Sequence, residues 1–308
     1  LIVEAGAVCK HGLPNAAGDH LTAAGRYVYV DGIYDANGIS EAFGVLLGTG
    51  ILDNTGPSNA VFTINQGNSD VANGGIGNGG EVYTWSGLFR NTGPAKLGIT
   101  KVGTNTLILA NANTYGGDTR VINGGILELG NVNAIQNSTY DQQSGDTGTL
   151  SFGNLTSATL GGLKSGANKT LPLENSSLAP VALTIGGNGQ TNTYAGNLSG
   201  SGSLTKIGGG IQTLSGTNTY AGSTTVSGGM LLVNGGLSGA GTVTVATGGA
   251  LGGIGFINGP VNVSGALRPG NNNIGKLTVN NTVTLAGTTV MEISRTTTTN
   301  SDNLTATT

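Results

Sequence analysis

The chain repeats its own sequence over a long interval. Five residues beginning at Ile99 (ITKVG) match five residues beginning at Leu204 (LTKIG), a shift of 105 positions. The match continues through Tyr115 and Tyr220 at the same shift, which becomes 104 after Val121. Two long copies of one pattern therefore cover roughly residues 42–140 and 155–235. Such a chain is expected to bury its hydrophobic surface by stacking each unit on its neighbours.

Short alternating runs such as VTV and VNV lie within the unit that contains the second copy (151–265), and glycine or asparagine turns separate them about every 8 to 12 residues. Alternation buries one side chain in two, as a β-strand does. The predicted strands are 211–214, 223–226, 231–233, 243–245 and 261–263. The side chains predicted to point inward are Val226, Leu231, Val233, Val243, Val245, Val261 and Val263.

This pattern predicts an all-β fold, a parallel β-solenoid (β-helix) with about 20 residues in each coil. A pair of β-sandwiches is disfavoured because aromatic residues make up only 5% of the chain. A β-propeller is disfavoured because its blades repeat every ~40–50 residues, whereas the repeat in this chain is 105 residues long. We expect one continuous solenoid in four parts: an N-terminal capping segment (1–41), two long repeat units (42–150 and 151–265), and C-terminal coils with a Thr-rich tail (266–308).

Composition narrows the possible partners. Leu, Ile, Val and Phe make up about 24% of the chain, which is enough for a folded core. Charged residues make up 9% and the net charge is −3, so nucleic acid and anionic membranes are poor partners. No run approaches the ~18 apolar residues of a membrane helix, so we expect no membrane insertion. The single cysteine excludes an internal disulfide, and the opening LIVEAGAVCK is typical of a processed or excised piece.

The second copy resembles a known repeat. Residues 200–208, 214–226 and 228–231, in that order, resemble the autotransporter-associated (passenger-associated) β-strand repeat. Residues 267–270 followed by 275–279 resemble the segment that follows such repeats in passenger domains. The resemblance implies a right-handed β-helix of the type V secretion class, secreted or displayed on a bacterial surface, and in most cases without catalysis in the repeat itself.

Two glycine-rich motifs might be taken for cofactor sites. Residues 270–276 (GNNNIGK) nearly spell a phosphate-binding loop, but Leu277 stands where the motif needs Ser or Thr, and a strand pattern follows. Residues 75–80 contain GxGxxG and half-resemble a calcium-binding nonapeptide, but Gly79 replaces the liganding Asp. Both are predicted to be glycine turns, so we expect no cofactor.

Metal binding would depend on Cys9, His11 and His20, the only cysteine and histidines present. Their spacing fits no standard site, and a fourth ligand such as Asp19 or Asp31 would have to be added. The competing interpretation is a buried thiol with two exposed imidazoles. We therefore predict no metal site.

Catalysis on a β-helix usually needs carboxylates clustered on one face. Here the 15 carboxylates are scattered. The nearest candidate pair, Asp118 and Glu128, has the uncharged counterparts Ser223 and Leu232 in the second copy. We predict no catalytic residues and no enzyme activity.

Tyr115 and Tyr220 occupy the same repeat position, and Tyr194 precedes a related Ala-Gly. Exposed in a row, such rings would bind glycans by stacking. The alternative is that they cover one turn of the solenoid against the next.

These observations predict an extracellular structural or adhesive β-solenoid, a fibre or surface-layer subunit that associates with itself end to end. The tail from Met291 to Thr308, with few charges and no proline, is expected to add a strand to a neighbour or to fold back as its own cap. The alternatives are a passenger adhesin that binds a glycan or a host receptor, and a polysaccharide lyase or hydrolase on a β-helix.

Overall fold

The computed structural model describes residues 1–12, 27–65, 80–270, 274–293 and 301–306, which form strands and turns and include no helix. They divide into two compact units. Unit 1 comprises residues 1–155 and 159–161, and unit 2 comprises residues 156–158 and 162–308. Each unit is a parallel β-solenoid, as the sequence predicts. The four-part division of the chain stays a prediction.

Unit 1 contains sixteen strands that lie wholly within it. They are β1 (Ile2–Val3), β2 (Val8–Lys10), β3 (Tyr27–Val30), β4 (Ile33–Asp35), β5 (Glu41–Phe43), β6 (Val45–Leu47), β7 (Ile51–Asp53), β8 (Ala60–Asn65), β9 (Val82–Trp85), β10 (Leu88–Phe89), β11 (Leu97–Val102), β12 (Thr106–Leu109), β13 (Thr119–Val121), β14 (Ile126–Leu129), β15 (Ile135–Gln142) and β16 (Thr149–Ser151).

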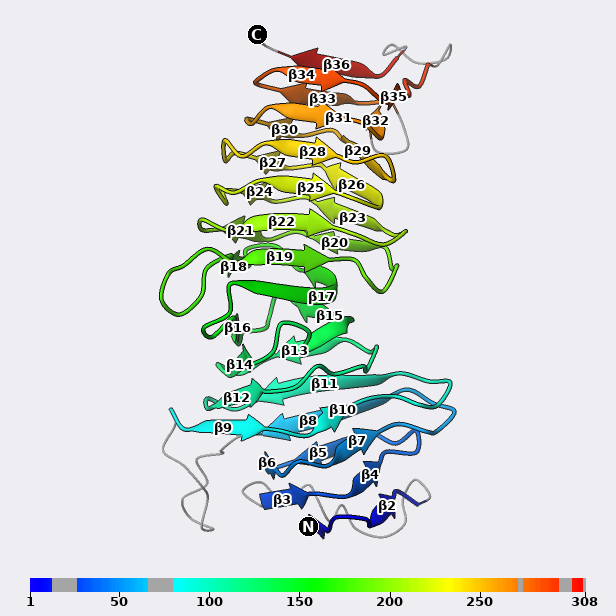
Figure 1. Ribbon diagram of the computed structural model, residues 1–308, viewed down its shortest axis with the longest axis vertical. Coiled ribbons are helices and arrows are strands. Elements are labelled where there is room, and N and C mark those ends of the chain that lie inside the picture. The colour runs from blue at the N-terminus through cyan, green and yellow to red at the C-terminus, as the bar shows by residue number, and fades with distance from the viewer. Residues whose placement is uncertain (13–26, 66–79, 271–273, 294–300, 307–308) are drawn as a thin grey trace. The chain divides into compact units, whose positions relative to one another are not determined.

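These strands stack in four parallel ladders: β1-β3-β6, β2-β4-β7-β10, β5-β8-β11-β13-β15 and β9-β12-β14-β16. Figure 1 shows one of them as β2, β4, β7 and β10 in succession. Strands from the predicted capping segment, β1 to β4, already belong to these ladders. Coil length varies, because β7 and β10 pair at a separation of 37 residues whereas β12 and β14 pair at 20.

Unit 2 contains nineteen strands, and β17 (Ser157–Ser165) has residues in both units. They are β18 (Thr170–Pro172), β19 (Ala182–Ile185), β20 (Asn192–Tyr194), β21 (Asn197–Ser199), β22 (Ser203–Lys206), β23 (Ile211–Leu214), β24 (Thr217–Asn218), β25 (Thr224–Val226), β26 (Gly229–Val233), β27 (Gly236–Leu237), β28 (Val243–Val245), β29 (Gly249–Gly253), β30 (Phe256–Ile257), β31 (Val261–Val263), β32 (Ala266–Pro269), β33 (Lys276–Val279), β34 (Val283–Leu285), β35 (Thr288–Thr289) and β36 (Asn303–Ala306).

The main ladders of unit 2 are also parallel: β19-β22-β25-β28-β31-β34, β20-β23-β26-β29-β32-β35 and β24-β27-β30-β33-β36, with a short pair β18-β21. Figure 1 shows β22, β25, β28 and β31 stacked in this order. Neighbours along the β22–β34 ladder lie 18 to 22 residues apart in sequence, close to the expected coil of about 20. All five strands predicted in the second copy are present, two of them with shifted bounds.

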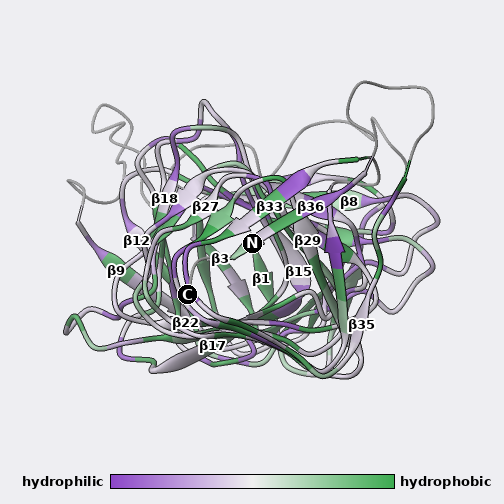
Figure 2. Cartoon of the chain, turned by 90° about the horizontal axis from the view of Figure 1, so that it is seen from above, coloured by the Kyte–Doolittle hydropathy of each residue, from purple (hydrophilic) through white to green (hydrophobic). Residues whose placement is uncertain are grey.

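The predicted aliphatic core is confirmed. Each of the seven side chains predicted to point inward has at most 2% of its surface exposed. The intervening residues Thr244 and Asn262 are exposed, so the period-2 alternation holds. Figure 2 shows apolar and polar residues interspersed along the strands, as this alternation requires.

The tail folds back on its own chain where it is described. Strand β36 pairs in parallel with β33, with Leu304 beside Leu277. The buried Asp302 fixes the start of this strand, because its carboxylate accepts hydrogen bonds from the backbone N–H groups of Gly275 and Glu292, at 2.9 and 2.6 Å. Two arrangements of the tail were predicted, addition to a neighbouring molecule and folding back as a cap. Residues 303–306 fold back on their own chain.

Candidate functional site

The strongest chemical candidates are the polar residues that both copies of the repeat share. Lys101 and Lys206 are the first pair, and both are buried. Each lies at an inward-facing position and stacks between aliphatic residues, Lys206 between Ile185 and Val226. Their ammonium groups reach the turn that ends the strand. Lys206 Nζ donates to the carbonyl oxygens of Ile207 and Gly208 at 2.6 and 3.0 Å.

The acceptors of both lysines are backbone carbonyls. Lys101 Nζ donates to Val102 O and Gly103 O at 2.6 and 3.0 Å, the same pair of turn positions as in the second copy. Lys206 also reaches Gly228 O in the following coil, at 3.2 Å. Burial lowers the pKa of Lys101 to about 8 and lowers the pKa of Lys206. Both lysines therefore close their own turn inside the core, Lys206 also ties that turn to the following coil, and neither presents a free amine to a ligand.

The turn that follows Lys206 in the sequence requires glycine at position 208. Gly208 has a φ of +69°, and a Cβ atom there would lie 2.1 Å from the carbonyl oxygen of Gly186 in the preceding coil. The equivalent Gly103 has a φ of +75°. The Lys-x-Gly motif common to both copies is therefore a lysine followed by the turn whose carbonyls it binds.

Asn113 and Asn218 form the second shared pair, and both are buried. Asn218 Oδ1 accepts from the backbone N–H of Leu198 in the preceding coil, at 3.0 Å. Its Nδ2 donates to Gly236 O in the following coil, at 3.2 Å. Asn113 makes the same two bridges, from Phe89 N at 2.8 Å and to Ala134 O at 2.9 Å. Each asparagine therefore ties three successive coils together.

The three tyrosines considered for glycan stacking are also buried, so these three form no exposed ladder. Tyr115, Tyr194 and Tyr220 each have at most 4% of their surface exposed. The hydroxyl of Tyr115 lies 2.6 Å from Thr119 Oγ1, and that of Tyr220 lies 2.5 Å from Thr224 Oγ1. Their rings cover the coils from inside, which is the alternative that the sequence left open.

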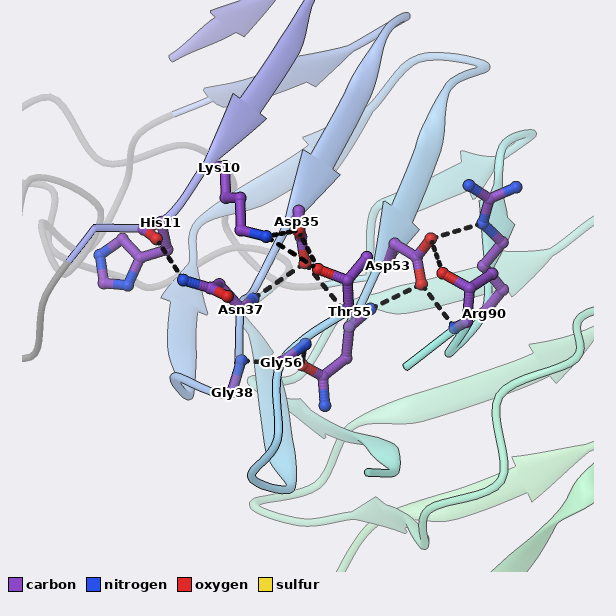
Figure 3. Close-up of polar contacts among 11 residues, drawn as sticks. Lys10, His11, Asp35, Asn37, Gly38, Asp53, Thr55, Gly56 and Arg90 are labelled. Carbon is purple, nitrogen blue, oxygen red and sulfur yellow. Dashed lines mark hydrogen bonds and ion pairs between the residues drawn. The ribbon is translucent and has the colours of Figure 1, made fainter. Parts of the chain in front are cut away.

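A charged column lies along the β2-β4-β7-β10 ladder, where Asp35 is the register partner of both Lys10 and Asp53 (Figure 3). The Asp35 carboxylate accepts from the backbone N–H groups of Asn37 and Thr55 at 2.9 and 3.0 Å, and from Thr55 Oγ1 at 2.6 Å. Lys10 Nζ lies 3.4 Å from it. Burial raises the pKa of Asp35, but the hydrogen bonds from Thr55, Asn37 and Lys10 outweigh burial, so the pKa lies below its usual value.

Asp53 repeats this arrangement one coil later. Its carboxylate accepts from Thr92 N and Thr92 Oγ1, both at 2.9 Å, and pairs with Arg90 Nε at 2.7 Å (Figure 3). Each aspartate therefore clamps the turn of the coil that follows it. Because donors from the chain already fill both carboxylates, the column is a structural brace and not an open carboxylate site.

The residues considered for metal binding do not form a site in the described part of the chain. His11 Nε2 lies 2.8 Å from Glu41 Oε1, and Cys9 is a half-buried free thiol beside Tyr34. No three His, Cys, Asp or Glu side chains gather closely enough to hold an ion within the described ranges. His20 lies outside them.

The candidate catalytic pair falls on different ladders. Asp118 is exposed just before β13, whereas Glu128 lies in β14 and accepts a hydrogen bond from Ser151 Oγ at 3.2 Å. The central residues of the phosphate-loop-like motif, 271–273, and nearly all of the GxGxxG motif (75–79) lie outside the described residues.

A small hollow lies beside the C-terminal coils of unit 2. Arg268, Glu292 and Asp302 supply its charged lining. Because both oxygens of Asp302 already bind backbone N–H groups, the hollow offers no free buried acceptor there.

The part of the chain that the structure describes also has no helix that is long and apolar enough to span a membrane.

Sequence comparison matches the two segments that contain the shared residues to one repeat family. Two segments, residues 99–129 and 204–233, match the family described as the passenger-associated-transport-repeat. Each segment contains one member of the lysine, asparagine, tyrosine and threonine pairs described above. No curated protein and no solved structure matches the chain. The resemblance predicted from the residues is confirmed.

Proposed function

We propose that this chain, which carries two passenger-associated-transport repeats on a β-solenoid, is a structural and non-catalytic part of a bacterial passenger protein displayed outside the cell. Within that class, we propose a fibre or surface-layer role rather than adhesion to a glycan. The repeat family supports the secreted, surface-exposed setting, and the use of the shared residues supports the structural role.

One observation carries the structural role. Polar residues that recur in both matched segments are buried and hydrogen-bonded within the chain, as Lys206, Asn218 and Tyr220 illustrate. A repeat that recognised a ligand would keep some of its shared polar groups at the surface. Here the shared groups bond within the chain, and both asparagines bridge successive coils, which supports a role of the repeat in stacking.

Display outside the cell is tested on intact bacteria that produce the protein. We expect an antibody raised against residues 1–308 to label intact cells, and added protease to remove that label. Labelling that appears only after the cells are permeabilised would contradict the proposed location.

The alternatives are tested with the purified chain. Buried tyrosines and hydrogen-bonded carboxylates give little support to glycan binding or to polysaccharide cleavage. We expect no retention on a glycan array and no new reducing or unsaturated ends when the chain is incubated with polygalacturonate and related polysaccharides. Retention of one glycan class would favour the adhesin, and release of sugar would favour the lyase or hydrolase.

A further inference from the structure

Asparagine followed directly by glycine recurs along the chain. Five such asparagines lie in the described residues: Asn37, Asn123, Asn188, Asn234 and Asn258. Two more, Asn73 and Asn78, lie outside them. The pair is chemically labile, because glycine has no side chain to hinder attack of its backbone nitrogen on the amide carbon of the asparagine. The attack needs a side chain that is free to turn and a nitrogen that no strong hydrogen bond holds.

Hydrogen bonds hold the first and the last of the five pairs. The side-chain amide of Asn37 donates to His11 O at 3.0 Å, and the N–H of Gly38 donates to Asn54 Oδ1 at 2.8 Å. The side chain of Asn258 is bonded at both ends to residues of the neighbouring coils, at 3.1 and 2.9 Å. Neither asparagine is free to turn toward the nitrogen that follows it.

The pairs at Asn188 and Asn234 are also restrained. Asn188 Oδ1 accepts from the backbone N–H of Gln190 at 3.1 Å, and the N–H of the glycine after Asn188 donates to a backbone carbonyl of the same turn. Asn234 is half-buried, and the N–H of Gly235 donates to Leu214 O in the preceding coil at 3.1 Å. In both pairs a backbone carbonyl binds the glycine N–H.

The pair at Asn123 differs from the other four. Asn123 and Gly124 form an exposed turn between β13 and β14, with φ values of +55° and +73°. The Asn123 side chain has no hydrogen-bond partner among the described residues. The N–H of Gly124 donates to the hydroxyl of an exposed side chain, Thr147, at 2.9 Å. Within the described part of the chain, that one bond restrains the reacting nitrogen.

We propose that Asn123 is the first of these five asparagines to deamidate, and that the Thr147 hydroxyl limits the rate. The backbone nitrogen of Gly124 attacks the side-chain carbonyl carbon of Asn123, loses its proton and expels ammonia, which leaves a cyclic succinimide. Water then opens the ring at either carbonyl. The products are aspartate and isoaspartate, in which the main chain runs through Cβ and Cγ. Either product adds one negative charge, and no reactant other than water is needed.

The modified turn packs on the turn that Lys101 closes. A Cβ atom at Gly125 would lie 2.7 Å from Gly103 O and 3.1 Å from Lys101 Nζ. Isoaspartate at position 123 lengthens this closely packed turn by one backbone atom. The second copy has Ser-Gly-Gly at the corresponding positions, 227–229, and no asparagine. The reaction therefore alters the first repeat and leaves the second unchanged.

Peptide mass spectrometry of the full chain tests the order of reaction. The folded protein is incubated for several weeks at mildly alkaline pH, and the modified positions are assigned by fragmentation. We expect conversion at Asn123 to be at least tenfold faster than at Asn37 or Asn258. Asn123→Gln is expected to abolish the early product, because the longer side chain would have to close a larger ring.

A matched pair of variants tests the restraint. Thr147→Val removes the acceptor of the Gly124 N–H and is expected to speed conversion at Asn123 severalfold. Thr104→Val is the control. Thr104 lies against the same turn, with Cγ2 3.8 Å from a Cβ atom at Gly124, but it has no hydrogen-bond partner in the described ranges. This variant is expected to leave the rate unchanged.

The possible results separate clearly. Conversion at Asn37, Asn188, Asn234 or Asn258 before Asn123, or equal rates at all five, would overturn the inference. An unchanged rate in Thr147→Val, or equal acceleration in Thr104→Val, would overturn the role of the Thr147 hydroxyl. The inference does not depend on display outside the cell, so each of these results leaves the proposed function standing.

Discussion

The two units build the same parallel ladders with different side chains. In unit 1, charged groups close the turns: the ion pairs of Asp35, Asp53 and Asp146 lie there, as does the contact between His11 and Glu41. The close ring contacts among Tyr34, Phe43, Phe62, Trp85, Phe89 and Tyr115 lie there too. In unit 2, aliphatic columns such as Val226, Val245 and Val263 fill the core.

The two units also differ in the longest coil that separates paired strands in the ladders compared here. Successive strands in the β22–β34 ladder of unit 2 lie 18 to 22 residues apart, so equal side chains fall on equal positions and stack directly. In unit 1 the separation reaches 37 residues between β7 and β10. Asp53, at the end of β7, clamps the turn that follows β10. The clamp of Asp35 spans the shorter coil between β4 and β7, whose paired residues lie 18 positions apart, so the aspartate clamps occur on coils of both lengths.

The largest expected effect is a charge in the aliphatic columns of unit 2. Val245 is fully buried between Val226 and Val263, so Val245→Asp leaves an unpaired carboxylate in the core. We expect the free energy of unfolding to fall by about 4 kcal/mol, as for other uncompensated buried charges. Urea denaturation measures it. Thr244→Asp, on the outward-facing neighbour, is the control and is expected to change stability by less than ~0.5 kcal/mol.

The next effect tests the clamps of unit 1. Asp53→Ala leaves Arg90 and the N–H and hydroxyl of Thr92 without their acceptor. We expect a loss of about 3 kcal/mol in unit 1. Asp31→Ala removes a carboxylate that, among the described residues, hydrogen-bonds to Thr49 alone, at a more exposed position, and is expected to cost about 1 kcal/mol or less. Equal losses from the two variants would contradict the role assigned to the clamp.

A smaller effect comes from the pH dependence of the buried lysines. Because burial lowers the pKa of Lys101 to about 8, the folded chain releases its proton at a pH where the unfolded chain, with a lysine pKa of ~10.4, still holds it. The unfolded state then binds more protons, so stability rises with pH. We expect a gain of roughly 1 kcal/mol between pH 8 and pH 9.5. Lys101→Met is expected to remove the part of this gain that Lys101 contributes, and a slope that persists unchanged in the variant would refute the assignment.

The rise of stability with pH is expected to end near pH 10, because the buried tyrosines then act in the opposite direction. Burial raises the pKa of Tyr115 and of Tyr220, so these phenols stay neutral in the folded chain while they ionise in the unfolded one above about pH 10. Stability therefore falls again above that pH.

The smallest effect compares the two tyrosines. Tyr220→Phe removes one hydroxyl contact, to Thr224. In the first copy Thr119 also contacts Ser138 Oγ, at 2.7 Å, so the partner of Tyr115 keeps a hydrogen bond when the phenol is removed. We expect Tyr220→Phe to cost about 1 kcal/mol and Tyr115→Phe less. Thermal unfolding of the two variants measures the difference, and the reverse order would contradict this comparison.

Much of the fold could be predicted from the sequence, because alternation along a strand indicates which side chains are buried, as Val243, Thr244 and Val245 illustrate. The same alternation also indicates that Lys101 is buried. Lys101 lies two residues after Ile99 on β11, so the two side chains share the inward face. The clamps were missed because Asp35 and Asp53 bind residues of the next coil, and register across a coil of variable length is not visible in the sequence. The fold-back of β36 was open for the same reason.

The central claim is that the shared residues of the repeat hold successive coils together, and hydrogen exchange of Asn218→Ala tests it most directly. Asn218 Oδ1 is the acceptor for the amide N–H of Leu198 in the preceding coil, whereas the amide of Leu204 donates to Ser223 O. We predict that the variant exchanges the Leu198 amide at least tenfold faster, corresponding to ~1.4 kcal/mol, while Leu204 keeps its protection. Unchanged protection at Leu198 would contradict the claim.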